Sequence, residues 1–296
     1  MQKSKLPAKL YKYCSFNAKT LHILSREEVY FANPVSFNDP LDCKPTIKVD
    51  VDRSSLERLF VKMLADESGK TEALRRLQEC RYLSSEFGDY RTNIEAGEFY
   101  DRTLASAILD GFTRLMSKFG VLALAKRWNC PLMWSHYANQ HEGICIEYST
   151  RNPTPVEINA VSYNKPRAIK VSDLIDWKFN ASVIAENAIR DTFFFSKANP
   201  WKYEQEWRAI NKKAGLDFSP FTISGVYFGL RCSSAVQTAL VKLFDNDHRQ
   251  IKFYGVYESD DDFSLKRYEV NTDEIRACGV SSSYLRDFEG LSSLSS

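Results

Sequence analysis

A long block of helix-type hydrophobic spacing interrupts a chain whose other apolar segments alternate as strands do. From Ser54 to about Lys118, apolar residues recur on single helix faces, and Leu104, Ile108 and Phe112 form the clearest example. The strand-like segments before and after this block are short and unevenly spaced. This order favours an α+β fold with a mixed or antiparallel sheet core and a helical insertion over about residues 53–119, in place of a regular doubly wound sheet.

Outside the insertion, alternation and turn residues predict further elements. The expected strands are residues 9–16, 29–32, 121–125, 144–148, 156–163, 203–210, 221–229, 251–257 and 265–270. Helices are expected after Asn17, with Leu21 and Leu24 facing inward, over 173–190 and over 235–244. We expect one domain over residues 1–289 and a flexible tail over 290–296, which is rich in Ser and Leu.

Composition limits the classes of function that fit this chain. Of its 296 residues 44% are apolar, which is enough for a substantial core. The formal net charge is only +2, whereas general nucleic-acid binders usually carry a clear basic excess, so this class is not expected. Seven scattered cysteines indicate reduced thiols in a cytoplasmic protein. No apolar run approaches the about 18 residues of a membrane span, so we expect no membrane contact.

The stretch from Met133 to Tyr148 gathers more chemically capable side chains than any other. Its pattern predicts a short helix that leads into a strand, with Asn129 as cap, Pro131 in the first turn and Gly143 left-handed at the end. Polar side chains at such a junction often line a cleft. The candidates for substrate contact or catalysis in this stretch are Trp134, Ser135, His136 and Tyr137.

Two carboxylates in the segment KYEQEWRAI form the second candidate cluster. On a strand, Glu204, Glu206 and Arg208 would share one face because alternate residues point the same way. Two neighbouring carboxylates repel, which raises the pKa of one and leaves an acid and a base near neutral pH. Arg208 on the same face can keep both ionised, and a solvated edge strand with an ordinary ion pair is the alternative.

The loop NPVSFNDP supplies a third set of polar side chains. Asn38 and Asp39 stand before a proline, where such residues usually serve the turn itself. The functional alternative is a loop that folds over a ligand, with Phe37 as a wall and Asn38 or Asp39 as polar contacts.

Standard motifs are missing from the sequence, which narrows the possible chemistry. His136 and His141 are five residues apart and would not share a helix face, so no metal is expected. His136 with Ser135 or Cys145 is a possible base–nucleophile pair, but no nucleophile elbow surrounds it. No glycine-rich dinucleotide motif or Walker loop is present.

Four segments together resemble a bacterial family known as domain of unknown function 2971. They are LYKYCSF, FANPVSFNDP, LMWSHYANQHEGICIEY and WKYEQEWR, and the resemblance spans roughly Leu10 to Ile210. The opening strand, capped helix, strand and loop also look like the start of ADP-ribosyltransferase-type enzymes, one branch of which ends its motif set with Glu-x-Glu. Lys12, where that group often has His, can donate a hydrogen bond to a ribose hydroxyl or a phosphate.

The second resemblance implies an NAD-using ADP-ribosyltransferase-like or glycohydrolase-like effector of toxin or phage defence, with NAD as substrate. Glu206 would be the catalytic carboxylate and Glu204 its partner, because a carboxylate stabilises the oxocarbenium character of the breaking ribose bond. The remaining residues would bind or orient substrate; they are His136, Tyr137, Ser135, Trp134, Tyr11, Lys12, Tyr13, Phe37, Asn38, Asp39 and Arg208.

Two other functions stay open. One is a non-catalytic module of a defence system that senses a nucleotide or peptide in the same cleft. The other is a metal-dependent nuclease that uses Glu204, Glu206 and Asp39 with Mg²⁺. The acceptor and any protein partner are not specified by the sequence.

Overall fold

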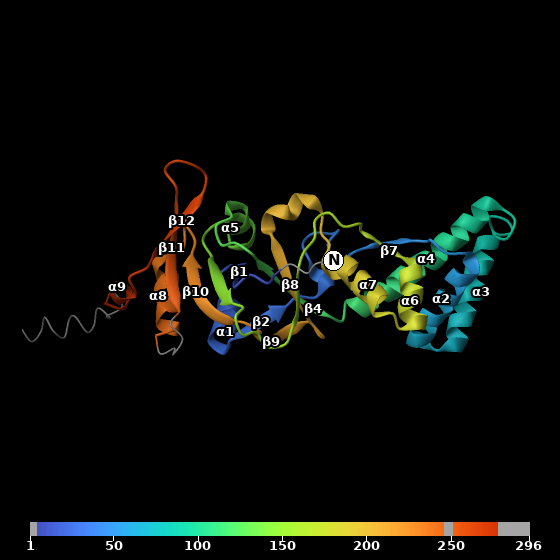
Figure 1. Ribbon diagram of the computed structural model, residues 1–296, viewed down its shortest axis with the longest axis horizontal. Helices are drawn as coiled ribbons and strands as arrows, with labels where there is room; N and C mark the ends of the chain where they lie inside the picture. The colour runs from blue at the N-terminus through green and yellow to red at the C-terminus, as the bar shows by residue number, and fades with distance from the viewer. Residues whose placement is uncertain (1–4, 246–250, 278–296) are drawn as a thin grey trace, which may run out of the picture.

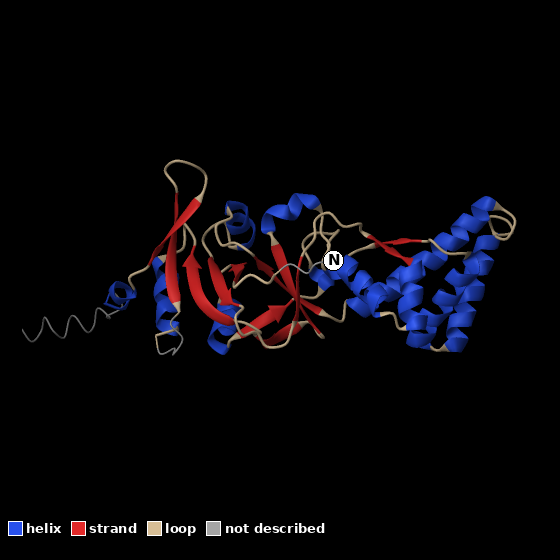
Figure 2. Cartoon of the chain, viewed as in Figure 1, coloured by secondary structure: helices blue, strands red, loops and turns tan. Residues whose placement is uncertain are grey.

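An eight-stranded mixed sheet organises the computed structural model, which describes residues 5–245 and 251–277. Its strands are β1 (Lys9–Cys14), β4 (Gly120–Ala125), β5 (Ile144–Ser149), β6 (Glu157–Ala160), β8 (Glu206–Asn211), β10 (Thr222–Phe228), β11 (Lys252–Glu258) and β12 (Leu265–Glu269). They lie in the order β12-β11-β10-β5-β1-β4-β8-β6, antiparallel except for the parallel pair β10 and β11. The expected α+β class with a mixed sheet core is confirmed (Figure 2).

Two small sheets and a set of helices complete the fold. The small sheets pair β2 (Glu28–Phe31) with β9 (Gly215–Phe218) and β3 (Thr46–Lys48) with β7 (Ala168–Lys170). The α-helices are α1 (Ala18–Arg26), α2 (Arg53–Ser68), α3 (Lys70–Ser85), α4 (Ile94–Met116), α5 (Pro131–Tyr137), α6 (Val171–Asn180), α7 (Val183–Phe194), α8 (Ser234–Leu243) and α9 (Thr272–Ala277). Two 3₁₀ helices are η1 (Pro34–Ser36) and η2 (Asn199–Glu204). The expected tail over 290–296 lies outside the described residues.

The large sheet is covered on both faces (Figure 1). On β1, Leu10 packs into one core cluster together with Leu24 of α1 and Leu240 of α8. Tyr11, the next residue, packs into a different cluster with Trp134 of α5. The alternation along β1 therefore sends successive side chains to α1 and α8 on one face and to α5 on the other.

The insertion forms a helical block at one end of the elongated molecule (Figure 1). Helices α2, α3 and α4 bury one apolar stripe each, and α6 packs beside them. At the centre of this core, the Phe112 ring meets Trp177 at 6.4 Å and Phe193 at 5.7 Å between ring centroids. Phe193 belongs to α7, so the core of the block runs on toward the sheet. On α3, Leu77 is buried in this core, whereas Leu74 is 45% exposed.

Local backbone chemistry overturns three expectations. The helix expected over 173–190 is two helices, because Ala181 is left-handed (φ 51°) and Ser182 caps α7 by accepting the N–H of Ala185. The helix α5 is preceded by Cys130, with no side-chain cap from Asn129. Gly143 is not left-handed; residues 139–141 are, and Gly143 is required because a Cβ would lie 2.4 Å from the Cys14 carbonyl oxygen.

The cap after β1 behaves as expected, but one inward residue does not. Asn17 accepts the N–H of Thr20 through its side chain, and Leu24 of the capped helix is buried. Leu21, expected beside it, is 39% exposed. The side-chain cap fixes where the helix begins. Which of its side chains are buried depends on the elements that pack against the helix.

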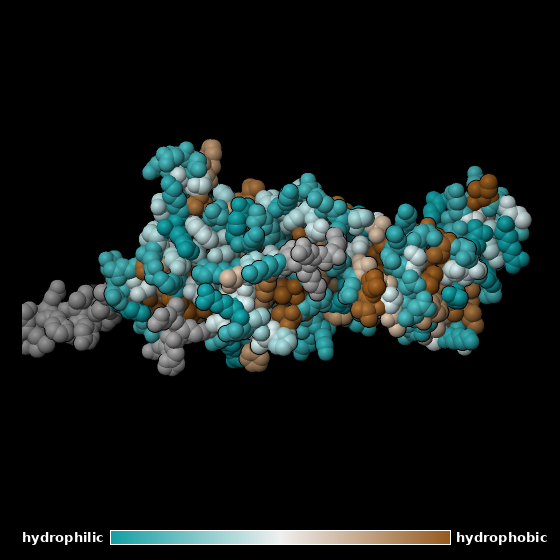
Figure 3. Space-filling view, viewed as in Figure 1, coloured by the Kyte–Doolittle hydropathy of each residue, from teal (hydrophilic) through white to brown (hydrophobic). Residues whose placement is uncertain are grey.

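The surface is mostly hydrophilic on the face shown in Figure 3, with apolar side chains in separate groups, one of them along the helical block. Separate exposed apolar side chains are usual for folded proteins. In residues 5–245 and 251–277, no helix has the length and apolar character needed to cross a bilayer. The six cysteines of those residues are all free thiols.

The core of the helical block yields a stability prediction. Replacing Phe112, which is fully buried, with alanine should lower the free energy of unfolding by about 3–5 kcal/mol because a cavity replaces the ring. The matched variant Leu74→Ala should change it by less than about 0.5 kcal/mol, because that side chain is half-exposed. Chemical denaturation measures both, and equal effects would show that Phe112 does not pack as described.

Candidate functional site

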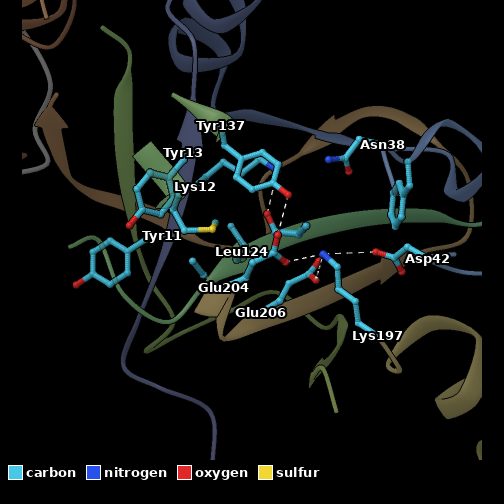
Figure 4. A pocket seen from close by; sticks show the side chains of 14 residues that line it. Tyr11, Lys12, Tyr13, Asn38, Asp42, Leu124, Tyr137, Lys197, Glu204 and Glu206 are labelled. Carbon is cyan, nitrogen blue, oxygen red and sulfur yellow. Dashed lines mark hydrogen bonds and ion pairs between the residues drawn. The ribbon is translucent and has the colours of Figure 1, made fainter. Parts of the chain in front are cut away.

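A cavity opens where strands β1 and β4 of the large sheet stop pairing. Tyr11 and Ala125 are the one pair of these strands in register, whereas β1 and β5 pair along all six residues. The cavity has a volume of about 110 Å³. The residues that line it are Tyr11, Lys12, Tyr13, Phe37, Asn38, Asp42, Ala123, Leu124, Ala125, Met133, Tyr137, Lys197, Glu204 and Glu206 (Figure 4).

The two glutamates reach the cavity by a turn, not by a shared strand face. Glu204 ends η2, and the strand β8 begins only at Glu206. Gln205 between them is left-handed (φ 45°), which ends the 3₁₀ helix and redirects the chain. The expectation that Glu204 lies on the strand face of Glu206 and Arg208 is therefore wrong, although both carboxylates line the same cavity.

Arg208 lies behind the cavity wall and is fully buried. Its Nε and one terminal nitrogen donate to Glu206 at 2.8 and 2.9 Å. Its terminal nitrogens donate to both oxygens of Asp42 at 2.9 and 2.6 Å, and one also donates to the Phe194 carbonyl at 2.8 Å. Since these bonds use all five N–H groups of the guanidinium, Arg208 has none left for a substrate. This corrects its expected place in the cleft, because it supports Glu206 from behind.

Lys197 connects Glu204, the third carboxylate, to the Arg208 cluster. Its ammonium lies 2.5 Å from Glu204, 3.3 Å from Glu206 and 3.6 Å from Asp42, and its side chain is only 5% exposed. Figure 4 shows these groups converging on the floor of the cavity. Three carboxylates thus face two cations, Lys197 and Arg208, which leaves one negative charge without a counter-ion when every carboxylate is ionised.

That excess charge falls on Glu204. Burial raises the pKa of Glu204, and the Glu206 charge adds to this, so the net shift is upward despite Lys197. Burial also acts to raise the pKa of Glu206, but Arg208 and Lys197 outweigh it and lower that pKa to about 2. For Lys197, burial acts to lower the pKa, but the three carboxylates outweigh it and raise it. Glu204 therefore takes up a proton more readily than an ordinary glutamate, whereas Glu206 stays ionised.

Tyr137 and Lys12 complete the polar wall. The Tyr137 hydroxyl donates to Glu204 at 2.7 Å, and burial raises the pKa of that hydroxyl. Lys12 donates from Nζ to the Ala123 carbonyl at 2.9 Å, across the gap between β1 and β4. Asn38 is exposed at the mouth beside Tyr137, and the Phe37 ring is 5.3 Å from the Arg208 guanidinium carbon.

Several expected site residues lie elsewhere. His136 is exposed, outside the cavity lining, with its ring 6.4 Å from that of Tyr203. Trp134 is fully buried in the core and donates from its indole to the Trp128 carbonyl at 2.7 Å. The Asp39 side chain accepts a hydrogen bond from the N–H of Leu41 at 2.9 Å. It therefore stabilises its own turn, which is the first of the two roles considered for it.

Ser135 has an imidazole neighbour, but it is His141 instead of His136. The Ser135 Oγ lies 3.2 Å from His141 Nε2 and donates to the Pro131 carbonyl at 3.1 Å. Neither Ser135 nor His141 is among the residues that line the cavity, so this pair lies outside the candidate site. In residues 5–245 and 251–277, no three His, Cys, Asp or Glu side chains are grouped to hold a metal ion.

Asp42 and Lys197 are not among the site residues predicted from the sequence. A signal for Asp42 exists: an arginine in a strand between Trp207 and Ala209 is buried, and a buried guanidinium needs carboxylates. Asp42, an acid in a loop next to the predicted site, is a candidate for such a partner. Lys197 carries no comparable local signal, since its partners arrive from η2 and β8.

The opposite pKa shifts of the glutamates predict opposite effects on stability. The lowered pKa of Glu206 means that its contribution is present above its ordinary pKa of 4.5 and is lost as pH falls toward 2. The raised pKa of Glu204 means that its contribution is greatest at low pH and declines as pH rises above 4.5. Denaturation of Glu206→Gln and Glu204→Gln from pH 2 to 8 should therefore give differences from wild type that change in opposite directions. Parallel curves would contradict the charge assignment.

Comparison with known proteins gives one match. Residues 133–209, about a quarter of the chain, match the model of a family described as protein of unknown function (DUF2971). Comparisons with curated proteins and with solved structures give no significant match. The matched segment contains residues 133–137 of α5 together with Lys197, Glu204, Glu206 and Arg208, so all of the ion cluster except Asp42 falls within the match.

Proposed function

We propose that the cavity binds the nicotinamide end of NAD and that the protein cleaves the nicotinamide–ribose bond, passing the ADP-ribosyl group to an acceptor or to water. NAD and a setting in toxin or phage defence come from the resemblance to ADP-ribosyltransferase-type enzymes. The observation that carries the proposal is Glu204, which lies on the wall of a cavity of single-ring size in a cluster of three carboxylates and two cations.

The charge balance supports this reaction. Breaking the bond to a cationic nicotinamide develops positive charge on the ribose, and a nearby negative charge lowers the energy of that transition state. Asp42, Glu204 and Glu206 together carry one more negative charge than Arg208 and Lys197 balance, and among the three carboxylates Glu204 and Glu206 line the cavity beside Asp42. A cationic ribose would supply the missing counter-charge.

The proton balance supports it as well. The acceptor must lose a proton when it attacks the ribose, and a carboxylate with a raised pKa is suited to take it. Glu204 fits this role, whereas Glu206 has a pKa of about 2 and is held on both oxygens by Arg208. The proposal therefore exchanges the two roles inferred from sequence: Glu204 acts on the substrate, and Glu206 with Arg208 and Lys197 positions it.

The size and lining of the cavity limit what enters. A cavity of about 150 Å³ is known to hold a benzene ring, so about 110 Å³ suits one small ring and not a dinucleotide. Tyr13 and Phe37 provide aromatic walls for that ring. The ribose and phosphates would lie at the mouth, where Asn38 and Lys12 can donate hydrogen bonds.

The direct test is release of nicotinamide from NAD. Wild-type protein should release it, and Glu204→Gln should lower the rate by about 10²–10⁴-fold, the usual loss for a general base. Glu98→Gln, at an exposed glutamate of α4, should leave the rate unchanged. Absence of turnover with water or any acceptor, together with no NAD binding by calorimetry, would refute the proposal.

A non-catalytic sensing module is the second candidate. It is favoured by the engagement of both Glu204 oxygens, one by Tyr137 and the other by Lys197. NAD binding without nicotinamide release, with equal affinity in wild type and Glu204→Gln, would support this module over the enzyme. A metal-dependent nuclease has less support, because Asp39 is committed to its turn and Glu204 and Glu206 both face Lys197.

A further inference from the structure

Two lysines line the cavity in different electrostatic surroundings. Lys197 is surrounded by three carboxylates within 3.6 Å, which stabilise its ammonium form. Lys12 donates one hydrogen bond to a backbone carbonyl, and none of the ion pairs found in the described part of the chain includes it. The nitrogen of Lys12 therefore has no carboxylate paired with it, whereas that of Lys197 has three.

The position of Lys12 reinforces this difference. It lies in β1, where that strand separates from β4, and its side chain fills the gap while lining the cavity. Burial lowers the pKa of Lys12, and the opposing effects of Cys14, Glu206 and Glu204 do not cancel it. A lysine that is desolvated in a pocket loses its proton more readily and becomes a nucleophile.

We propose that Lys12 is a reactive amine that forms an imine with small aldehydes of about the size of one ring or a short open-chain sugar. The size limit comes from the cavity volume, and Tyr13 and Phe37 favour a flat or ring-shaped carbonyl compound. The proposal uses the same cavity as the proposed cleavage of NAD, but imine formation and nicotinamide release are measured independently, so each can fail without the other.

The reaction balances without an oxidant or reductant. The lone pair of the uncharged amine forms a bond to the carbonyl carbon, and the C=O π pair moves to oxygen, which takes up a proton while nitrogen loses one. The resulting hydroxyl leaves as water with a proton from the Glu204 carboxyl, and the nitrogen lone pair closes the C=N bond. The nitrogen of this protonated imine then loses its remaining proton, which restores the Glu204 carboxyl, so one amine and one aldehyde give one imine and one water.

Reductive trapping tests the proposal on the full-length protein. The probe is pyridine-4-carboxaldehyde with sodium cyanoborohydride, which reduces an imine to a stable secondary amine, and mass spectrometry of proteolytic peptides locates the label. At pH 7 we expect Lys12 to be labelled several-fold faster than Lys48, which is exposed in β3. The difference should narrow at pH 9, because a larger fraction of solvent-exposed lysine side chains is then uncharged. Lys197 should stay unlabelled.

Two variants complete the experiment. Lys12→Arg keeps a positive charge and should lose the label at this position while labelling of Lys48 is unchanged. Glu204→Gln should slow labelling of Lys12 alone. The proposal would be overturned if wild-type Lys12 were labelled no faster than Lys48 at pH 7, or if Lys197 were labelled as fast as Lys12. Both measurements use the wild-type protein, so they do not depend on whether the variants fold.

Discussion

The buried guanidinium of Arg208 is the interaction on which the site depends. It joins three parts of the chain that are far apart in sequence: Asp42 in the loop after η1, Glu206 on its own strand and the Phe194 carbonyl at the end of α7. Removing one partner from a buried ion pair typically costs about 3–5 kcal/mol, because the other charge stays desolvated. The loop that carries Phe37 and Asn38 is thus anchored to the sheet by charge, next to the cavity that it helps to form.

This arrangement explains how adjacent glutamates acquire different chemistry. Glu206 shares its oxygens with two cations, whereas Glu204 has only Lys197 and a tyrosine hydroxyl. Both are buried, so desolvation acts on each in the same direction. The difference comes from the number of cations within reach, which is set by the left-handed turn at Gln205.

Much of the fold could be predicted from sequence because it depends on periodicity. The alternation of Ile144, Ile146 and Tyr148 with Cys145 fixed the faces of β5, and the helical stripe at Leu104 and Ile108 fixed α4. What failed depends on single left-handed residues: Ala181 splits one expected helix, and Gln205 moves Glu204 off the strand. Neither alanine nor glutamine favours that conformation, so only the surrounding packing determines it.

The candidate site was predicted in part. The first strand, the FNDP loop and the two glutamates do meet at one cavity, as expected from a resemblance and from charge spacing. His136 was expected to act in the same cleft as the two glutamates, but it lies outside the cavity lining. On a helix, however, only one side faces the sheet, and Trp134 and Met133 occupy it. The lysine that meets the acids comes from a segment with no motif.

The path of α7 has a consequence for how this protein can vary. Phe193 packs against Phe112 in the helical block, and the next residue, Phe194, gives its carbonyl to Arg208 at the site. One helix thus serves the insertion and the ion cluster at once. If the insertion were exchanged for an unrelated one, the Phe194 carbonyl would still have to lie within hydrogen-bonding distance of Arg208. We therefore expect the helical block and the cavity to change together in evolution.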